Sequence, residues 1–163
     1  MNLHSYSLKD ILLAAMKSEI DSRTVYEALA ERVENAFLRD RLLFLSHEEE
    51  KHRIFIEGLY KQKISTGNYI LPDETPVPVP FLKLPAEPVL LSQVFESAMG
   101  AEQASHDFYE EMADLFEDMQ IRTTLLYFAD MEMGHYRILN DELKILKRFE
   151  DFDTQWPMMN LGP

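Results

Sequence analysis

The sequence predicts an all-α protein, a four-helix bundle of two repeated helical hairpins with a long crossover between the second and third helices. Three observations favour this fold. Four long segments carry apolar residues at helical spacing, a proline-rich stretch divides them into two pairs, and the second pair repeats the first after 83 residues, as from Glu19 to Glu102. Strand-like alternation is nearly absent from the chain.

The first hairpin is predicted to contain helices over residues 8–34 and 37–63. Ser7 and Asp10 resemble a capping box, which satisfies backbone N–H groups that the first turn of a helix leaves free. A short turn near residue 35 joins the two helices, so they should lie antiparallel.

Residues 64–88 are predicted to form the crossover. They contain residues that cannot continue a helix and that favour extended backbone, among them Gly67, Pro72, Pro76, Pro78, Pro80 and Pro85. A helix of about 27 residues is about 40 Å long, whereas about 25 extended residues reach roughly 80 Å. The segment can therefore run the full length of the bundle.

The second hairpin is predicted over residues 90–117 and 121–149, followed by an acidic, Met-rich tail at 150–163. Because 163 residues suit one hydrophobic core, the chain is expected to form a single domain, 1–163.

The repeat includes the residues with the most distinctive chemistry. One gapless register aligns four pairs of polar residues: Glu19 with Glu102, Tyr26 with Tyr109, Glu49 with Glu132, and His52 with His135. The two Glu-x-x-His motifs of the chain therefore occupy equivalent places. Chance has little reason to align them, so the sequence predicts a duplicated hairpin.

Composition excludes several kinds of chemistry. Without cysteine the chain cannot form disulfides, thiolate metal sites, iron–sulfur clusters or a cysteine nucleophile. It shows neither a signal-peptide pattern nor a stretch of roughly 20 apolar residues, so we expect a cytoplasmic protein without a membrane partner. The net charge of −13 argues against nucleic acid and anionic membrane surfaces as partners.

Six polar residues interrupt the apolar stripes of the predicted helices: Glu19, Glu49, His52, Glu102, Glu132 and His135. Distances along the chain from the turns place them at one level of the bundle. Buried unpaired carboxylates are unfavourable by several kcal/mol each and repel one another. Two divalent cations would neutralise the four glutamates, and this nitrogen and oxygen donor set suits iron or manganese and, less well, zinc.

Other polar and sulfur-containing residues receive plainer interpretations. Four lie off the stripes and are expected to face solvent: His47, Glu48, Glu50 and His106. Met16 and Met112 are expected to fill gaps in the core. Arg23 is expected to reach outward or to pair with a carboxylate. Tyr26 and Tyr109 are either core tyrosines bonded to buried carboxylates or participants in redox chemistry.

Four segments resemble the metal-bearing helices of rubrerythrin-like proteins in the ferritin-like superfamily: SEIDSRTVYEALAERV, SHEEEKHRIFIEGL, GAEQASHDFYEEMADLF and ADMEMGHYRILNDEL. The resemblance covers about residues 8–149. It implies a ferritin-like, oligomeric protein with two iron ions that acts on dioxygen or hydrogen peroxide. By position, Glu19 and Glu102 would be terminal ligands, Glu49 and Glu132 bridging ligands, and His52 and His135 nitrogen ligands, with Tyr26 and Tyr109 beside them.

Two departures from that pattern bear on function. Rubrerythrins that act as peroxidases typically carry a cysteine-bound iron in a rubredoxin domain, and these residues contain no cysteine, so a separate electron donor such as a rubredoxin-like protein is expected. Ser105 also stands where such peroxidases tend to have a seventh carboxylate. That substitution puts the peroxide-specific exchange of ligands in question.

Three functions are therefore compatible with the sequence. The first is a di-iron oxidoreductase that reacts with hydrogen peroxide or dioxygen, working as a homodimer or larger homo-oligomer. The second is an iron-binding or ferroxidase-type protein that handles iron without turnover of peroxide. The third is a metal-free helical interaction module. The long crossover also leaves open whether both hairpins of one site come from one chain.

Overall fold

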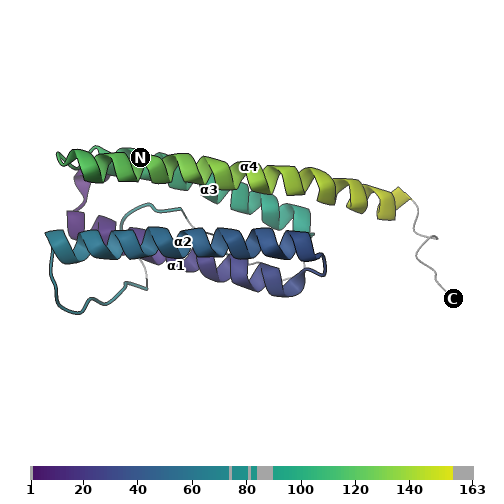
Figure 1. Ribbon diagram of the computed structural model, residues 1–163, viewed down its shortest axis with the longest axis horizontal. Helices are drawn as coiled ribbons and strands as arrows, with labels where there is room; N and C mark the ends of the chain where they lie inside the picture. The colour runs from purple at the N-terminus through teal and green to yellow at the C-terminus, as the bar shows by residue number, and fades with distance from the viewer. Residues whose placement is uncertain (1, 74, 81, 84–89, 156–163) are drawn as a thin grey trace.

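The chain folds into four long helices (Figure 1). The structure is a computed structural model that describes residues 2–73, 75–80, 82–83 and 90–155. A short 3-10 turn, η1 (Leu3–Ser5), precedes the four helices. The helices are α1 (Leu8–Arg32), α2 (Ala36–Lys63), α3 (Leu91–Ala113) and α4 (Met119–Gln155). No strand occurs among the residues described, which confirms the predicted all-α class.

The helices pack as two hairpins, α1 with α2 and α3 with α4. In Figure 1 α2 and α3 run in the same direction, as a lengthwise crossover requires, while α1 and α4 run in the opposite direction. This arrangement confirms the predicted bundle. No helix within the described residues is long and apolar enough to cross a membrane.

The last helix is longer at both ends than the prediction of 121–149. The carboxylate of Asp118 accepts hydrogen bonds from the backbone N–H groups of Gln120 and Ile121, so α4 already begins at Met119. At its other end α4 continues to Gln155, and the prediction of a tail from residue 150 was wrong there. Residues 150–155 contain neither glycine nor proline, and the first helix-breaking residue is Pro157. The rest of the predicted tail, 156–163, lies outside the described residues.

Side-chain caps begin the two helices of the first hairpin. The Ser7 hydroxyl accepts the backbone N–H of Asp10 and donates to its carboxylate, which confirms the predicted cap of α1. The Asn35 side chain accepts the N–H groups of Phe37 and Leu38 at the start of α2. The turn between α1 and α2 therefore ends at a fixed residue.

In each hairpin an arginine of the second helix forms hydrogen bonds to the end of the first helix. The two arginines occupy equivalent positions of the repeat. Arg39 of α2 donates to the carbonyl oxygens of Ala30 and Val33 at the end of α1. Arg122 of α4 donates to the carbonyl of Ala113 and to the carboxylate of Asp114 at the end of α3. A cation at a helix C-terminus also interacts favourably with the helix dipole.

Two apolar clusters fill the bundle. The first includes Met16 and Met112, both fully buried, which confirms their role in packing. The second includes Leu42 and Phe95. Six polar residues were predicted for the core. On each helix, those it carries lie between its residues in the first cluster and its residues in the second. They form one polar layer across the bundle.

The crossover packs along the bundle past this polar layer. It contributes Val77 to the first apolar cluster and Leu82 to the second. Between them, the carbonyl oxygen of Pro80 accepts a buried hydrogen bond of 2.7 Å from the Ser18 hydroxyl of α1. The crossover thus covers the side of the polar layer where Ser18 adjoins Glu19.

Candidate metal centre

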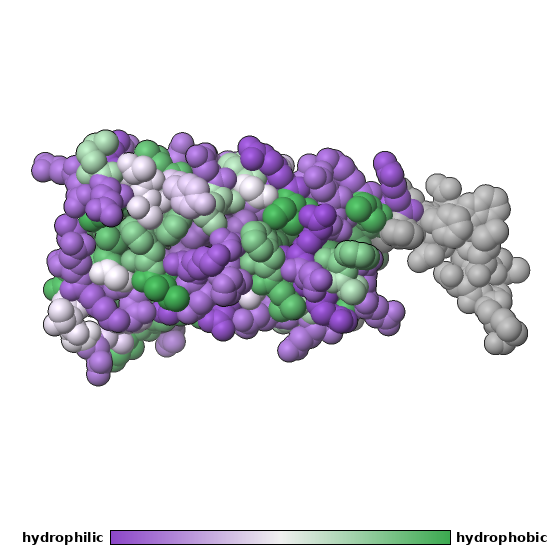
Figure 2. All heavy atoms as spheres, in the orientation of Figure 1, coloured by the Kyte–Doolittle hydropathy of each residue, from purple (hydrophilic) through white to green (hydrophobic). Residues whose placement is uncertain are grey.

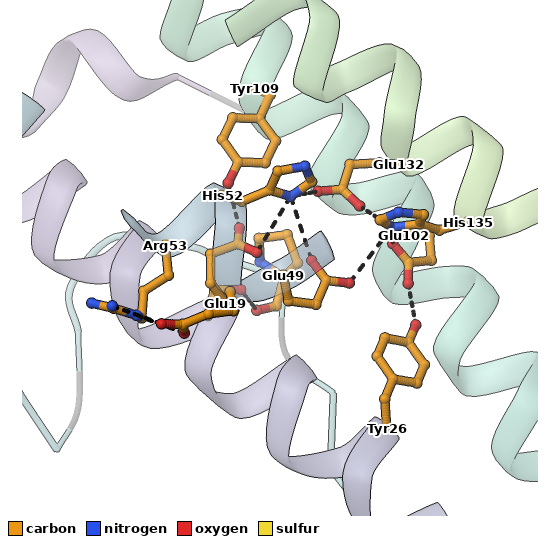
Figure 3. Close-up of polar contacts among 12 residues, drawn as sticks. Glu19, Tyr26, Glu49, His52, Arg53, Glu102, Tyr109, Glu132 and His135 are labelled. Carbon is orange, nitrogen blue, oxygen red and sulfur yellow. Dashed lines mark hydrogen bonds and ion pairs between the residues drawn. The ribbon is translucent and has the colours of Figure 1, made fainter. Parts of the chain in front are cut away.

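The six predicted ligands meet in one buried cluster (Figure 3), and each is at most 5% exposed. Their donor atoms form two overlapping groups, each within 4.8 Å: Glu19, Glu49, His52 and Glu132, and Glu49, Glu102, Glu132 and His135. Glu49 and Glu132 belong to both groups. That sharing is the arrangement that two metal ions bridged by two carboxylates require.

Distances within the cluster follow the repeat. His52 Nδ1 lies 3.0 Å from Glu132 Oε1, 3.5 Å from Glu49 Oε2 and 3.6 Å from Glu19 Oε2. His135 Nδ1 lies 3.0 Å from Glu132 Oε2, 3.5 Å from Glu102 Oε2 and 3.6 Å from Glu49 Oε1. Glu49 and Glu132 therefore turn one oxygen toward each histidine.

Several donor atoms of the cluster lack a hydrogen-bond partner. Among the described residues His52 Nε2 and His135 Nε2 have no partner, while His52 Nδ1 and Glu132 Oε1, although 3.0 Å apart, do not form a well-directed hydrogen bond. An unsatisfied buried polar atom is unfavourable by about 1–3 kcal/mol, so native interiors contain few of them. Imidazole and carboxylate donors are also the ligands that iron and manganese accept. The residues present thus fit a dinuclear metal site.

Without a bound cation, burial and the neighbouring charges act differently on the four glutamates. Burial raises the pKa of Glu19 to about 8 and also raises the pKa of Glu102. Burial acts in the same direction on Glu49 and Glu132, but the two histidines outweigh it and hold their pKa values below the ordinary range. The shared pair is therefore the more anionic pair of carboxylates.

The two histidines also have shifted pKa values. Burial alone would lower the pKa of His52 and His135, yet three carboxylates around each ring raise it well above its usual value. Protons then supply the positive charge that two divalent cations would otherwise bring. Metal binding to these residues must release protons.

Tyr26 and Tyr109 connect the two hairpins through the cluster. The Tyr26 hydroxyl of α1 donates to Glu102 of α3, and the Tyr109 hydroxyl of α3 donates to Glu19 of α1. Figure 3 shows the two rings at opposite ends of the cluster. Burial raises the pKa of both phenols well above the usual value, with help from Glu102 and Glu19 respectively, so both stay protonated donors. The repeat alone could not reveal this exchange of partners.

Among the polar residues expected at the surface, Glu48 departs from the prediction. His47 is exposed and Glu50 is partly exposed, whereas Glu48 is only 6% exposed. Glu48 pairs with Lys51 and lies seven residues after Arg41 on the same stripe of α2, and Arg41 pairs with Glu142 of α4. Helical spacing identified the innermost stripe of α2 but not the neighbouring stripe that the second hairpin covers.

Arg23 and His106 are two further polar residues that were expected to point away from the core. Arg23 reaches outward to Glu27 and Glu50, at 2.8 Å from each. His106 is partly buried, and its Nδ1 lies 3.0 Å from the carbonyl oxygen of Ala129. With Asp107 and Glu110 it forms another group of possible donors, but the two acidic residues are exposed, where such groups are common without a metal.

Aromatic neighbours of the two histidines were not identified from the sequence. The ring of Phe128 lies 4.3 Å from that of His52, between centroids, and the ring of Phe44 meets that of His135 edge-on at 6.5 Å. Phe128 belongs to an apolar stripe, whereas Phe44 has no signal in the periodicity. Ser105 is partly buried, and within the described chain no seventh carboxylate joins the two groups.

Comparisons with known proteins agree with this geometry. A protein-family model described as Rubrerythrin matches residues 10–143. The solved structure of a hypothetical protein from Pyrococcus furiosus is similar, with 28% sequence identity and a TM-score of 0.78, over 90% of this chain and 94% of that chain. A search of curated proteins gave no match. The matched family and the buried carboxylate and histidine cluster together suggest a metal site, with iron as the metal that the family favours.

Proposed function

The chain belongs to the rubrerythrin family, and from this premise we propose that it is a non-haem di-iron oxidoreductase that reacts with hydrogen peroxide or dioxygen. One observation carries the proposal. The donor atoms form two groups that share Glu49 and Glu132, as two adjacent metal ions would need. A homodimer or larger homo-oligomer is part of the same proposal.

The six residues have distinct roles in this proposal. Glu19 and Glu102 each belong to one group and would act as terminal ligands, while Glu49 and Glu132 belong to both groups and would be shared. His52 and His135, one in each group, would provide the nitrogen ligands. The same donors would also accept manganese or a mixed pair.

When bound, an iron pair supplies the two electrons that reduce hydrogen peroxide, with two protons, to two water molecules, and a separate donor such as a rubredoxin-like protein restores them. The chain itself holds the site in shape and keeps it dry. The two apolar clusters close both ends of the polar layer. Tyr26 and Tyr109 keep Glu102 and Glu19 oriented by hydrogen bonds across the hairpins.

Anaerobic loading with ferrous iron, followed by peroxide or dioxygen, tests the proposal. We expect rapid oxidation of the iron, and repeated turnover once a reductant is added. Glu49→Gln and Glu132→Gln should abolish both, whereas Glu50→Gln, next in sequence but bound to surface arginines, should abolish neither. Iron that stays reduced with both oxidants would refute the proposal.

The alternative is an iron-binding or ferroxidase-type protein without catalytic turnover of peroxide. It rests on the same donor set and predicts one round of iron oxidation without turnover when reductant is added. Measurement of the oligomer's mass sharpens the distinction. Storage of a mineral needs a large hollow assembly, which a dimer cannot form.

A further inference from the structure

The two hairpins meet along two seams, and they are covered differently at the level of the metal centre. On the α1 side the crossover closes the bundle, because Val77, Pro80 and Leu82 pass the polar layer there and Pro80 is bonded to Ser18. The α2–α4 seam lies along the face turned toward the viewer in Figure 1. Within the described residues no segment of the chain crosses that seam. Only side chains separate the polar layer from solvent there.

One stripe of α2 lines this seam. Arg41 pairs across it with Glu142 of α4 at 2.6 Å, and farther along the stripe Glu48 pairs with Lys51. Phe44 lies between these two ion pairs and is 49% exposed. Figure 2 shows hydrophobic residues interspersed with hydrophilic ones over this face. The seam therefore has an aromatic ring where the flanking positions carry paired charges.

On α4 the residue that precedes His135 is a glycine, Gly134. Gly134 is the repeat equivalent of Lys51, so α4 has no side chain where α2 has a long one. A Cβ atom added at Gly134 would meet no atom within 4 Å, although the residue is partly buried. Gly100 of α3 also has open space, but it is exposed on the surface. The surface of α4 therefore has open space at the residue that precedes His135.

The two histidines differ in how they are shielded. The ring of His52 is fully buried, with Phe128 at 4.3 Å and Tyr109 at 5.7 Å between centroids. His135 has the half-exposed Phe44 at its edge. A route from solvent to the metal centre is therefore shorter at His135 than at His52.

We propose that Phe44 and the space at Gly134 form the passage by which a small oxidant reaches the His135 end of the metal centre. Phe44 limits the passage to molecules the size of hydrogen peroxide or dioxygen and excludes bulky organic hydroperoxides. The identity of the substrate rests on the proposed function, whereas the passage itself does not.

Azide binding to protein loaded with cobalt(II) measures the passage without turnover. Azide is a small anion, and its binding changes the visible absorbance of cobalt, which stopped-flow mixing follows. Phe44→Ala should raise the association rate, and Gly134→Leu should lower it, each by roughly tenfold, a typical effect of reshaping an apolar pocket. Because leucine has a higher helix propensity than glycine, slower binding in Gly134→Leu would not arise from a weaker helix.

Two variants serve as matched controls, one next to Phe44 in the sequence and one at another glycine that borders open space. Leu43→Ala removes a half-exposed neighbour of Phe44, and Gly100→Leu fills space on α3, so both should leave the azide rate unchanged. Equal rates in wild type, Phe44→Ala and Gly134→Leu would overturn the proposal. Azide that binds none of these proteins would overturn it as well, because an open passage admits an anion of this size.

Oxidant size provides the second measurement, on ferrous protein. The wild type should react with hydrogen peroxide far faster than with cumene hydroperoxide, and Phe44→Ala should reduce that ratio by roughly tenfold. Altered azide rates in a protein that never reacts with peroxide would support the passage and refute the oxidoreductase. Normal reaction with peroxide, together with unaltered azide rates and an unaltered ratio of the two peroxide rates, would support the oxidoreductase and refute the passage.

Discussion

The first and second hairpins keep the same residues toward the metal centre and different residues around it. Both contribute two glutamates and one histidine to the polar layer, and both fasten their turn with an arginine. Behind the ligands, Phe128 replaces the equivalent Leu45, and Ala101 replaces Ser18, which binds the crossover. At the surface His106 replaces Arg23.

This difference indicates which parts of the duplicated unit are constrained by the centre. A ligand would have to match its repeat partner if each of the two proposed ions is to have the same charge and geometry around it, whereas the residues behind the ligands need only fill their own space. The described part of the crossover covers only one seam between the hairpins. Different residues therefore surround the ligands of the first hairpin and those of the second. Equivalence of the ligands and inequivalence of the walls can be tested separately.

The largest expected effect concerns the ligands. Glu49→Gln and Glu132→Gln keep the side-chain volume but remove a charge that both donor groups share, so each should reduce the metal content of the purified protein from the proposed two ions per chain toward none. Elemental analysis of protein purified without added metal checks this. Glu50→Gln serves as the control, because it removes a charge bound only by Arg23 and Arg53 at the surface.

Loss of metal from only one of these two variants would contradict the equivalence of the two hairpins. One hairpin would then suffice for binding, and the shared position of Glu49 and Glu132 in both donor groups would have no functional meaning. Equal losses would extend the structural equivalence of the hairpins to metal binding.

A smaller effect, on the order of a few kcal/mol, is expected in the pH dependence of the metal-free protein. The pKa of Glu19 is about 8 in the folded chain and lower when unfolded, so the folded state holds an extra proton between those values. This contribution to stability is complete below the unfolded pKa and disappears as the pH rises through about 8. The raised pKa values of His52 and His135 act in the same direction. Unfolding by denaturant at pH 5.5, 7 and 9 should show decreasing free energies.

Matched variants relate this pH effect to the two hairpins. Glu19→Gln and Glu102→Gln both remove a carboxyl whose pKa is raised by burial, so each should reduce the loss of stability between pH 5.5 and 9. A flatter profile in only one variant would show that the hairpins differ in electrostatics as well as in their walls. Saturating divalent metal should reverse the trend, because metal binding releases protons.

The smallest expected effect concerns the arginines at the turns. Arg39 donates to two backbone carbonyls, at 2.8 and 3.2 Å, so Arg39→Met should lower the free energy of unfolding by about 1–2 kcal/mol. Arg122 is 3.5 Å from its carbonyl and otherwise pairs with exposed Asp114, so Arg122→Met should lower it by about 1 kcal/mol or less. Methionine keeps most of the apolar stem. Chemical denaturation of metal-loaded protein measures both, and a larger loss for Arg122 would contradict the comparison.

The bundle and the six residues of its polar layer could be predicted from the amino-acid sequence alone. Apolar spacing assigns residues to the inside of a helix, and a gapless repeat transfers that assignment from one hairpin to the other. Glu49 and His52 could be placed beside Glu19 because a short turn ties the levels of two antiparallel helices together. Such information is local, so the chain alone carries it.

The contacts between the two hairpins, in contrast, required the three-dimensional structure. The exchange of Tyr26 and Tyr109 between Glu102 and Glu19, the burial of Glu48 and the position of Phe44 at His135 all depend on how one hairpin packs against the other. Helical periodicity describes one helix at a time, so it contains no information on how two hairpins pack across each other. The same reason explains why duplicated ligands could be read from the sequence, while their unequal walls could not.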